Sequence, residues 1–302
     1  MIAENENFGG TWPYKANFCT TSGFRQHYVD EGSKNSEVII CLHGEPTWGY
    51  IYRRFIESLS KTYRVVVPDH MGFGKSETPQ DKDYTLQTHV DNMTSLIDYL
   101  KLKDITFVGQ DWGGPIAGAY TLRNPSQVKR LCLMNTVLGY SGEKAKKTPW
   151  FDWVSKHEEA GTLPGILGEL GSTVLSIMKI LGFQNNAVIT DEWIRAYSEA
   201  FPDRDSCIGG MQFPLDVHYK RIVPYIVDSI KNGDMEALLK KPAMLAYGLE
   251  DRAIDPTYAI NDFKALFPNG VITEMPNVGH FCQEDAPDEL IQLIDKFIKE
   301  TS

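Results

Sequence analysis

Asp111 stands among small residues in a segment that could support nucleophilic chemistry. Gly109-Gln110-Asp111-Trp112-Gly113-Gly114 follows the apolar run Ile105–Val108 and precedes a helical stretch, Ile116–Arg123. Glycine tolerates the cramped backbone of a tight strand-to-helix turn, so the pattern predicts that residue 111 is pushed out at the end of a strand. A lone Asp before a helix is more often a helix cap, but the flanking glycines and the segments below favour a nucleophile. A carboxylate that displaces a leaving group from an sp3 carbon forms an ester that water can open, which indicates halide displacement or epoxide opening.

Two later segments supply the acid and the base that such a nucleophile requires. Asp251 follows the apolar run Ala243–Tyr247, and we prefer it to its neighbours Glu250 and Asp255. His280 follows the run Gly270–Met275, on the loop before the last helix. The chain order nucleophile, acid, histidine is that of the α/β-hydrolase architecture. We therefore predict that Asp251 orients His280 and that His280 acts as the base.

The loop His43-Gly44-Glu45-Pro46-Thr47-Trp48 ends another apolar run and is expected beside Asp111. The backbone N–H of Glu45 is predicted to pair with that of Trp112 as an oxyanion hole. Two close carboxylates raise one another's pKa, so the Glu45 side chain is unusual here. It either holds the hydrolytic water or bonds Trp48 or the backbone.

The elements that position these residues alternate between short apolar runs and amphipathic helices. Such alternation predicts βαβ units and a mostly parallel sheet flanked by helices. The alternation stops after Asn135, and from there to about Tyr225 the sequence pattern predicts only helices. We predict an α/β core from residues 1–136 and 226–302 with an inserted helical cap of residues 137–225. The predicted strands are the run within Phe24–Glu31, Val38–Leu42, Arg64–Pro68, Ile105–Val108, Val128–Met134, Ala243–Tyr247 and Gly270–Met275; the predicted helices outside the cap are Leu86–Leu102, Ile116–Arg123, Pro256–Phe267 and Pro287–Lys299.

Composition excludes several classes of protein. The 302 residues carry 30 Lys+Arg against 40 Asp+Glu, a net charge of -10 without a basic cluster, so neither nucleic acid nor an anionic membrane is an expected partner. No window approaches the ~20 apolar residues of a membrane span, and Met1–Phe8 lacks the apolar stretch of a secretory signal, so we expect a cytoplasmic protein. The five cysteines are scattered singly, which predicts reduced core thiols and no zinc site.

From about Phe24 to about Ile298 the sequence resembles the haloalkane dehalogenases of the α/β-hydrolase superfamily. The matching segments are His43–Trp48, Gly72-Phe73-Gly74-Lys75-Ser76, Gly109–Gly114, Gly248–Asp251 and Gly279-His280-Phe281. Within this family, Glu at position 45 is similar to the subfamily that holds halide between two tryptophans. Trp112 matches the first of these. Phe151-Asp152-Trp153-Val154 looks like the segment of the second, with Trp150 close enough to confuse the register.

The resemblance implies that Asp111 displaces halide from a haloalkane and that Trp112 and Trp153 bind the departing anion. His280, oriented by Asp251, then activates water against the ester, while the N–H groups of Glu45 and Trp112 hold the oxyanion. No cofactor or metal is expected, and the expected ligands are a small apolar halogenated substrate and halide. We expect a monomer or a homodimer.

Three other functions stay open. An epoxide hydrolase would share the nucleophile and the histidine but would need acid donors, for which the cap offers Tyr140, Tyr197, Tyr219 and Tyr225. A related enzyme could act on β-lactones or on fluorinated acids, although the latter favour Arg where this chain has Trp112. A binding protein without catalysis is disfavoured because Asp111, Asp251 and His280 are all present.

Overall fold

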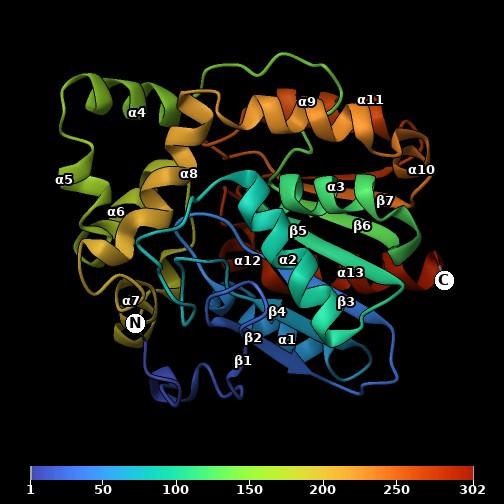
Figure 1. Ribbon diagram of the computed structural model, residues 1–302, viewed down its shortest axis with the longest axis horizontal. Helices are drawn as coiled ribbons and strands as arrows, with labels where there is room; N and C mark the ends of the chain where they lie inside the picture. The colour runs from blue at the N-terminus through green and yellow to red at the C-terminus, as the bar shows by residue number, and fades with distance from the viewer. Residues whose placement is uncertain (1, 302) are drawn as a thin grey trace.

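A single mostly parallel sheet forms the centre of the molecule. The computed structural model describes residues 2–301 and contains an eight-stranded sheet in the order β1-β2-β4-β3-β5-β6-β7-β8 (Figure 1). Neighbouring strands from β4 to β8 pair in parallel, whereas β2 is antiparallel to both β1 and β4. The strands are β1 Asn17–Cys19, β2 Gln26–Glu31, β3 Val38–Leu42, β4 Arg64–Pro68, β5 Ile105–Gln110, β6 Val128–Met134, β7 Ala243–Gly248 and β8 Val271–Met275.

Helices cover both faces of this sheet. α2, α3 and α9 pack against one another, while α1 and α13 pack together behind the sheet in the view of Figure 1. The α-helices are α1 Arg53–Leu59, α2 Leu86–Leu100, α3 Gly113–Arg123, α4 Pro149–Glu159, α5 Pro164–Leu167, α6 Leu170–Leu181, α7 Asp191–Ser198, α8 Ile208–His218, α9 Ile222–Asn232, α10 Met235–Leu239, α11 Pro256–Leu266, α12 Cys282–Asp285 and α13 Pro287–Glu300. Short 3-10 helices are η1 Phe8–Gly10, η2 Gly49–Tyr52, η3 Pro125–Gln127, η4 Asn186–Val188 and η5 Asp205–Cys207.

The α/β fold predicted from the sequence is confirmed, and most predicted elements end within two residues of the observed ones. β3, β4 and β6 have the predicted bounds. The edge strand β1 was not predicted, because three residues are too few to show a period.

Helices alone connect β6 to β7. Those that follow β6 first, α4 to α8, lie together at one end of the sheet, on the left of Figure 1. The predicted cap boundary between residues 225 and 226 falls inside α9, which packs on α2 and α3. The division into core and cap stays a prediction.

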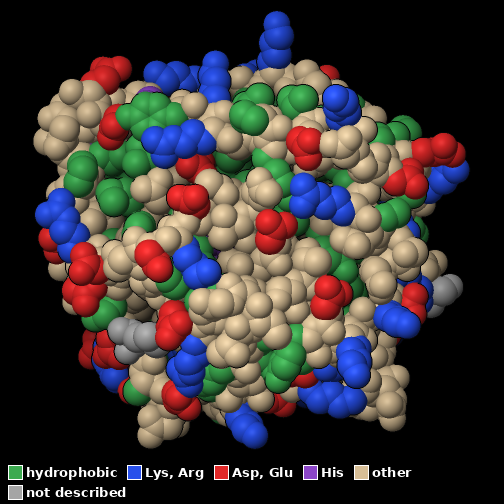
Figure 2. All heavy atoms as spheres, viewed as in Figure 1, with side chains coloured by type: hydrophobic (Ala, Val, Ile, Leu, Met, Phe, Trp, Pro, Cys, Tyr) green, Lys and Arg blue, Asp and Glu red, His purple; other side chains and the backbone are tan. Residues whose placement is uncertain are grey.

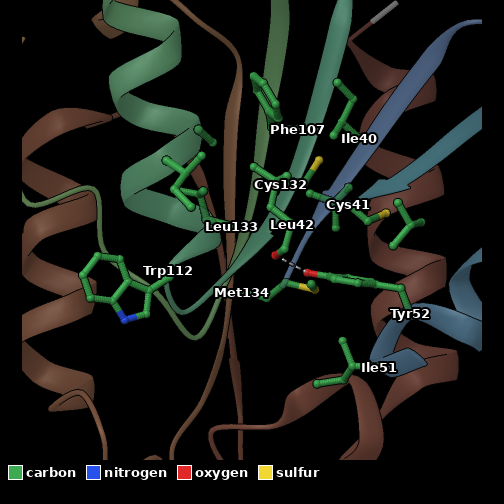
Figure 3. Close-up of a cluster of buried hydrophobic side chains, with 14 of the residues drawn as sticks. Ile40, Cys41, Leu42, Ile51, Tyr52, Phe107, Trp112, Cys132, Leu133 and Met134 are labelled. Atoms are coloured by element: carbon green, nitrogen blue, oxygen red, sulfur yellow. Dashed lines mark hydrogen bonds between the residues drawn. The ribbon is translucent and has the colours of Figure 1, made fainter. Parts of the chain in front are cut away.

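The core holds the functional end of the sheet in place. Every residue of β3 and β5 is buried, and their side chains pack with β6 and with η2 (Figure 3). The Tyr52 hydroxyl donates a hydrogen bond of 2.8 Å to the carbonyl of Leu42, the last residue of β3 (Figure 3). This bond ties η2 to the strand end from which the Glu45 loop departs.

The five cysteines are all buried and free, at positions 19, 41, 132, 207 and 282. Within residues 2–301 no helix is long and apolar enough to span a bilayer, and no three His, Cys, Asp or Glu side chains form a metal-binding group. On the face shown in Figure 2, acidic and basic side chains are interspersed, without a continuous basic surface on that side.

Candidate active site

Asp111 occupies the sharp turn between β5 and α3. Its φ of +51° is unusual for a residue with a side chain, and such strain is found where a structure holds a functional group in place. Gly44 makes the approach of its carboxylate feasible, because a Cβ at position 44 would lie 2.2 Å from Asp111 Oδ2. Gly113 likewise lets α3 meet β3, since a Cβ there would lie 2.3 Å from the Leu42 carbonyl oxygen. Sequence and structure thus agree on a strand-turn-helix that presents Asp111.

Two backbone N–H groups bond this carboxylate. The N–H of Glu45 donates to Asp111 Oδ2 at 2.9 Å, and the N–H of Trp112 also bonds the carboxylate. Burial raises the pKa of Asp111, while His280 and the two N–H groups act in the opposite direction. The two groups predicted as an oxyanion hole are therefore brought together around the Asp111 carboxylate.

His280 lies between Asp111 and Asp251. Its Nδ1 is 3.0 Å from Asp251 Oδ2, and its Nε2 is 3.6 Å from Asp111 Oδ1. An ionised carboxylate only accepts hydrogen bonds, so Nδ1 carries the proton and Nε2 is the unprotonated nitrogen that faces Asp111. Burial lowers the pKa of His280, but the carboxylates of Asp251 and Asp111 more than offset this and raise the pKa above its ordinary value. This arrangement can remove a proton from water beside Asp111.

Asp251 is itself fixed by donors that the sequence reasoning missed. Asn135 Nδ2 donates to Asp251 Oδ2 at 3.0 Å and the Tyr247 hydroxyl donates to the same oxygen at 3.1 Å. The N–H groups of Ala253 and Ile254 donate to Oδ1. Asn135 directly follows β6 and has a φ of +39°. A polar residue at the end of a strand was the sequence feature that could have identified it.

Gln110 is a second neighbour of His280 that was not predicted. Its Nε2 lies 3.2 Å from His280 Nε2 and donates to the His280 carbonyl at 3.0 Å. Gln110 could have been singled out in the sequence because it directly precedes Asp111.

A cavity of about 660 Å³ opens onto Asp111 and His280. Its walls are mostly apolar, and they come from the cap as well as from the sheet side. Glu45, Trp112, Trp150 and Phe151 contribute to the lining, with Pro214, Val217, Ile222 and Ile226 among the aliphatic side chains. Such a cavity suits a small apolar ligand whose reacting carbon lies against Asp111.

Comparison with known proteins identifies the relatives of this chain. The model of a protein family described as "alpha/beta hydrolase fold" matches residues 37–160. A haloalkane dehalogenase of Psychrobacter cryohalolentis is 33% identical over 292 residues, covering 92% of this chain and 88% of that protein. The chain belongs to the haloalkane dehalogenase family. A relative named cis-3-alkyl-4-alkyloxetan-2-one decarboxylase, from Shewanella oneidensis, is 31% identical over 299 residues, with 96% and 90% of the two chains covered.

Solved haloalkane dehalogenases share the fold. The tetrameric DpaA of Paraglaciecola agarilytica has a TM-score of 0.77 and 28% identity, with 97% of this chain and 96% of that chain covered. A putative ancestral haloalkane dehalogenase has a TM-score of 0.80 at 23% identity, with 94% and 99% covered.

Trp112 and Trp150 line the cavity, and an indole N–H could donate a hydrogen bond to an anion bound there. Trp112 stacks on Phe213 with ring centroids 4.1 Å apart, and its Nε1 has no acceptor within residues 2–301. An indole N–H can donate to an anion but cannot accept from one. Trp112 therefore lines the cavity with an indole N–H that has no acceptor in the described part of the chain.

The structure does not bring Trp153 to this cavity. Trp150 and Phe151 line it, whereas Trp153 is absent from the lining. Trp153 stacks on Trp150 with ring centroids 5.1 Å apart and makes a tilted contact with His157 at 4.5 Å. Trp153 follows Phe151 by two residues, about 200° around an α-helix. The cavity is thus lined by Trp150 and not by Trp153, which was the residue predicted from the sequence.

The four cap tyrosines considered as acids do not line the cavity either. The Tyr197 hydroxyl donates to Glu284 at 2.6 Å, and the Tyr219 hydroxyl donates to Glu158. The hydroxyls of Tyr140 and Tyr225 are buried without a hydrogen-bond partner within residues 2–301. This placement counts against an epoxide hydrolase that depends on these side chains.

Glu45 presents a carboxyl group to the cavity with no bond to Trp48. The Trp48 indole donates to the Ala196 carbonyl instead, and Glu45 Oε1 is buried without a hydrogen-bond partner within residues 2–301. Burial, together with the charge of Asp111, raises the pKa of Glu45 well above its ordinary value. A neutral carboxylic acid is the state that this environment favours.

Proposed function

We propose that this protein hydrolyses haloalkanes to an alcohol, halide and a proton. The observation that carries the proposal is that Asp111 Oδ2 accepts a hydrogen bond from the N–H of Glu45 while Oδ1 faces His280 Nε2 at 3.6 Å. Because Oδ2 is held, Oδ1 is the oxygen that attacks. The bond between carbon and halogen breaks as the bond from Oδ1 to carbon forms, and an alkyl ester results.

Trp112 stabilises the departing halide from the sheet side of the cavity and Trp150 does so from the cap. Both indoles supply N–H donors in an apolar site, where water does not compete for the anion. The assignment to the subfamily with Glu45 and two halide-binding tryptophans is part of this proposal.

Hydrolysis of the ester uses the other half of the site. His280 Nε2 takes a proton from water, whose oxygen adds to the Asp111 carboxyl carbon. The resulting oxyanion lies at Oδ2, between the N–H groups of Glu45 and Trp112. Collapse of this intermediate breaks the bond from the carboxyl carbon to the alkyl-bearing oxygen, and His280 returns its proton to the alcohol.

Bromide release from 1-bromobutane, with Asp111→Asn as the matched control, tests the proposal. Activity in the parent protein that is lost in the variant supports it. The His280→Phe variant should perform displacement only, so intact-mass spectrometry should find one butyl group on the protein. Absence of both bromide and adduct would refute the proposed function.

The oxetanone decarboxylase relative supports a second candidate, the opening of a β-lactone, a strained four-membered ester. The same carboxylate and cavity face either substrate. Incubation with a cis-3,4-dialkyloxetan-2-one, with detection of alkene and carbon dioxide, separates the two. Products from the lactone and none from bromoalkanes would favour the second candidate.

A cytoplasmic location, as well as a monomer or a homodimer, stays part of the proposal. DpaA is a tetramer. Light scattering of the purified protein would distinguish a monomer, a homodimer and a tetramer.

A further inference from the structure

One carboxylate besides those of Asp111 and Asp251 joins the histidine loop to the cap. Asp285 ends α12, five residues after His280. Its Oδ2 accepts a hydrogen bond of 2.8 Å from the N–H of Gly279. Its Oδ1 accepts from the N–H of Asn185 at 2.8 Å and from that of Gln184 at 3.1 Å. Residues a hundred positions apart are thus held by a single side chain.

The segment after α6 packs closely against both catalytic loops. A Cβ at Gly279 would lie 1.7 Å from the Gly182 carbonyl oxygen, so the two backbones touch. The N–H of Arg252 donates to the Leu181 carbonyl at 3.0 Å, one residue beyond Asp251. The cap therefore contacts the loop of the histidine and the loop of its acid at the same place.

Charged groups around His280 come from three elements. Asp251 follows β7, Asp111 precedes α3 and Asp285 ends α12, and each of these carboxylates raises the pKa of His280. The amide of Gln110 is the uncharged polar neighbour. Lys179 on α6 is the cation that faces Asp285.

We propose that Asp285 is a positioning residue, which fixes the loop of His280 toward Asp111 and ties that loop to the cap segment 182–185. This inference rests on the proposed function, in which His280 acts only in ester hydrolysis. Asp285 contacts no reacting atom. Its loss should therefore slow the second step and leave the displacement of halide at its original rate.

The variant Asp285→Asn tests this inference, because it preserves size while it removes the charge and one acceptor oxygen. Hydrogen bonds to charged groups contribute enough that hydrolysis should slow by roughly 10- to 100-fold. The rate of bromide release in the first turnover should stay within about twofold of the parent rate, and the alkyl-enzyme should accumulate. Asp288→Asn is the matched control, since Asp288 also lies in this region but pairs with Arg54 on the surface.

A readout that needs no turnover is the ring titration of His280 by NMR, assigned among the seven histidines with the His280→Phe variant. The pKa of His280 should be lower in Asp285→Asn than in the parent protein and unchanged in Asp288→Asn. Asp285→Glu keeps the charge but displaces the carboxylate, so it should hydrolyse slowly with a pKa of His280 near the parent value.

Hydrolysis at the parent rate in both Asp285 variants, or an unchanged pKa of His280 in Asp285→Asn, would overturn the inference. Failure of the proposed function would look different. The parent protein would then release no bromide and His280→Phe would form no adduct, while the titration would still report whether Asp285 acts on His280.

Discussion

Replacing Glu45 by glutamine should make the protein more stable relative to the parent as the pH rises. Glu45 is 4% exposed, its Oε1 has no hydrogen-bond partner within residues 2–301, and its pKa is raised well above the ordinary value by burial and by Asp111. The native protein therefore keeps this carboxyl group protonated at pH values at which the unfolded chain has released the proton.

The sign of the effect follows from proton counts. Where the native state binds one proton more than the unfolded state, the free energy of unfolding falls by about 1.4 kcal/mol for each pH unit. The loss begins near the ordinary Glu pKa of about 4.3 and ends at the raised native value. Glutamine has no proton to release, so the variant lacks this slope. Between these two pKa values, the stability difference between variant and parent should grow by up to about 1.4 kcal/mol for each pH unit.

Urea unfolding followed by tryptophan fluorescence across this pH range measures the difference. Titrating groups remote from Glu45 cancel because both proteins contain them. Glu236→Gln, at an exposed position on α10, is the matched control and should show no such growth. A stability difference between Glu45→Gln and the parent that stays constant with pH would refute the reasoning, since Glu45 would then ionise in its ordinary range.

Two further predictions concern the ion pair behind the site and the halide ligands. Arg53→Ala should lower the free energy of unfolding by about 3–5 kcal/mol, because it leaves Glu284 buried without its cation. The exposed control Arg54→Ala should cost at most about 1 kcal/mol in the same urea titration; equal losses would contradict the argument from burial. Trp150→Phe should weaken bromide binding roughly 10-fold or more, as measured by fluorescence quenching, whereas Trp153→Phe should change it by less than about twofold. The reverse order would restore Trp153 as the cap ligand.

Local sequence was sufficient for the parts of the site that depend on a short turn. The glycines around Asp111 reflect contacts within a few residues and with one neighbouring strand, and the apolar runs determine that β3 and β5 are buried. The order of Asp251 and His280 after the nucleophile then follows from the architecture. These features could be predicted because each is encoded near the residue concerned.

The cap and the supporting contacts could not be predicted in the same way. Whether Trp150 or Trp153 faces the cavity depends on the rotation of α4 about its axis, which packing against α8 sets. The bonds from Asn135 to Asp251 and from Asn185 to Asp285 join residues about a hundred positions apart. No local pattern reports such pairs, and without an alignment their coupling is invisible.

The burial of the five cysteines affects whether haloalkanes could alkylate the protein's own thiols. Haloalkanes alkylate thiols as well as carboxylates, and the thiolate is the form that reacts. Burial raises the pKa of Cys41, Cys132 and Cys282, so these groups stay protonated and out of contact with solvent. Cys282 lies only two residues beyond His280. In the proposed reaction an alkyl group on Asp111 leaves with water, whereas a thioether would be permanent, so we expect the buried thiols to limit self-inactivation over many turnovers.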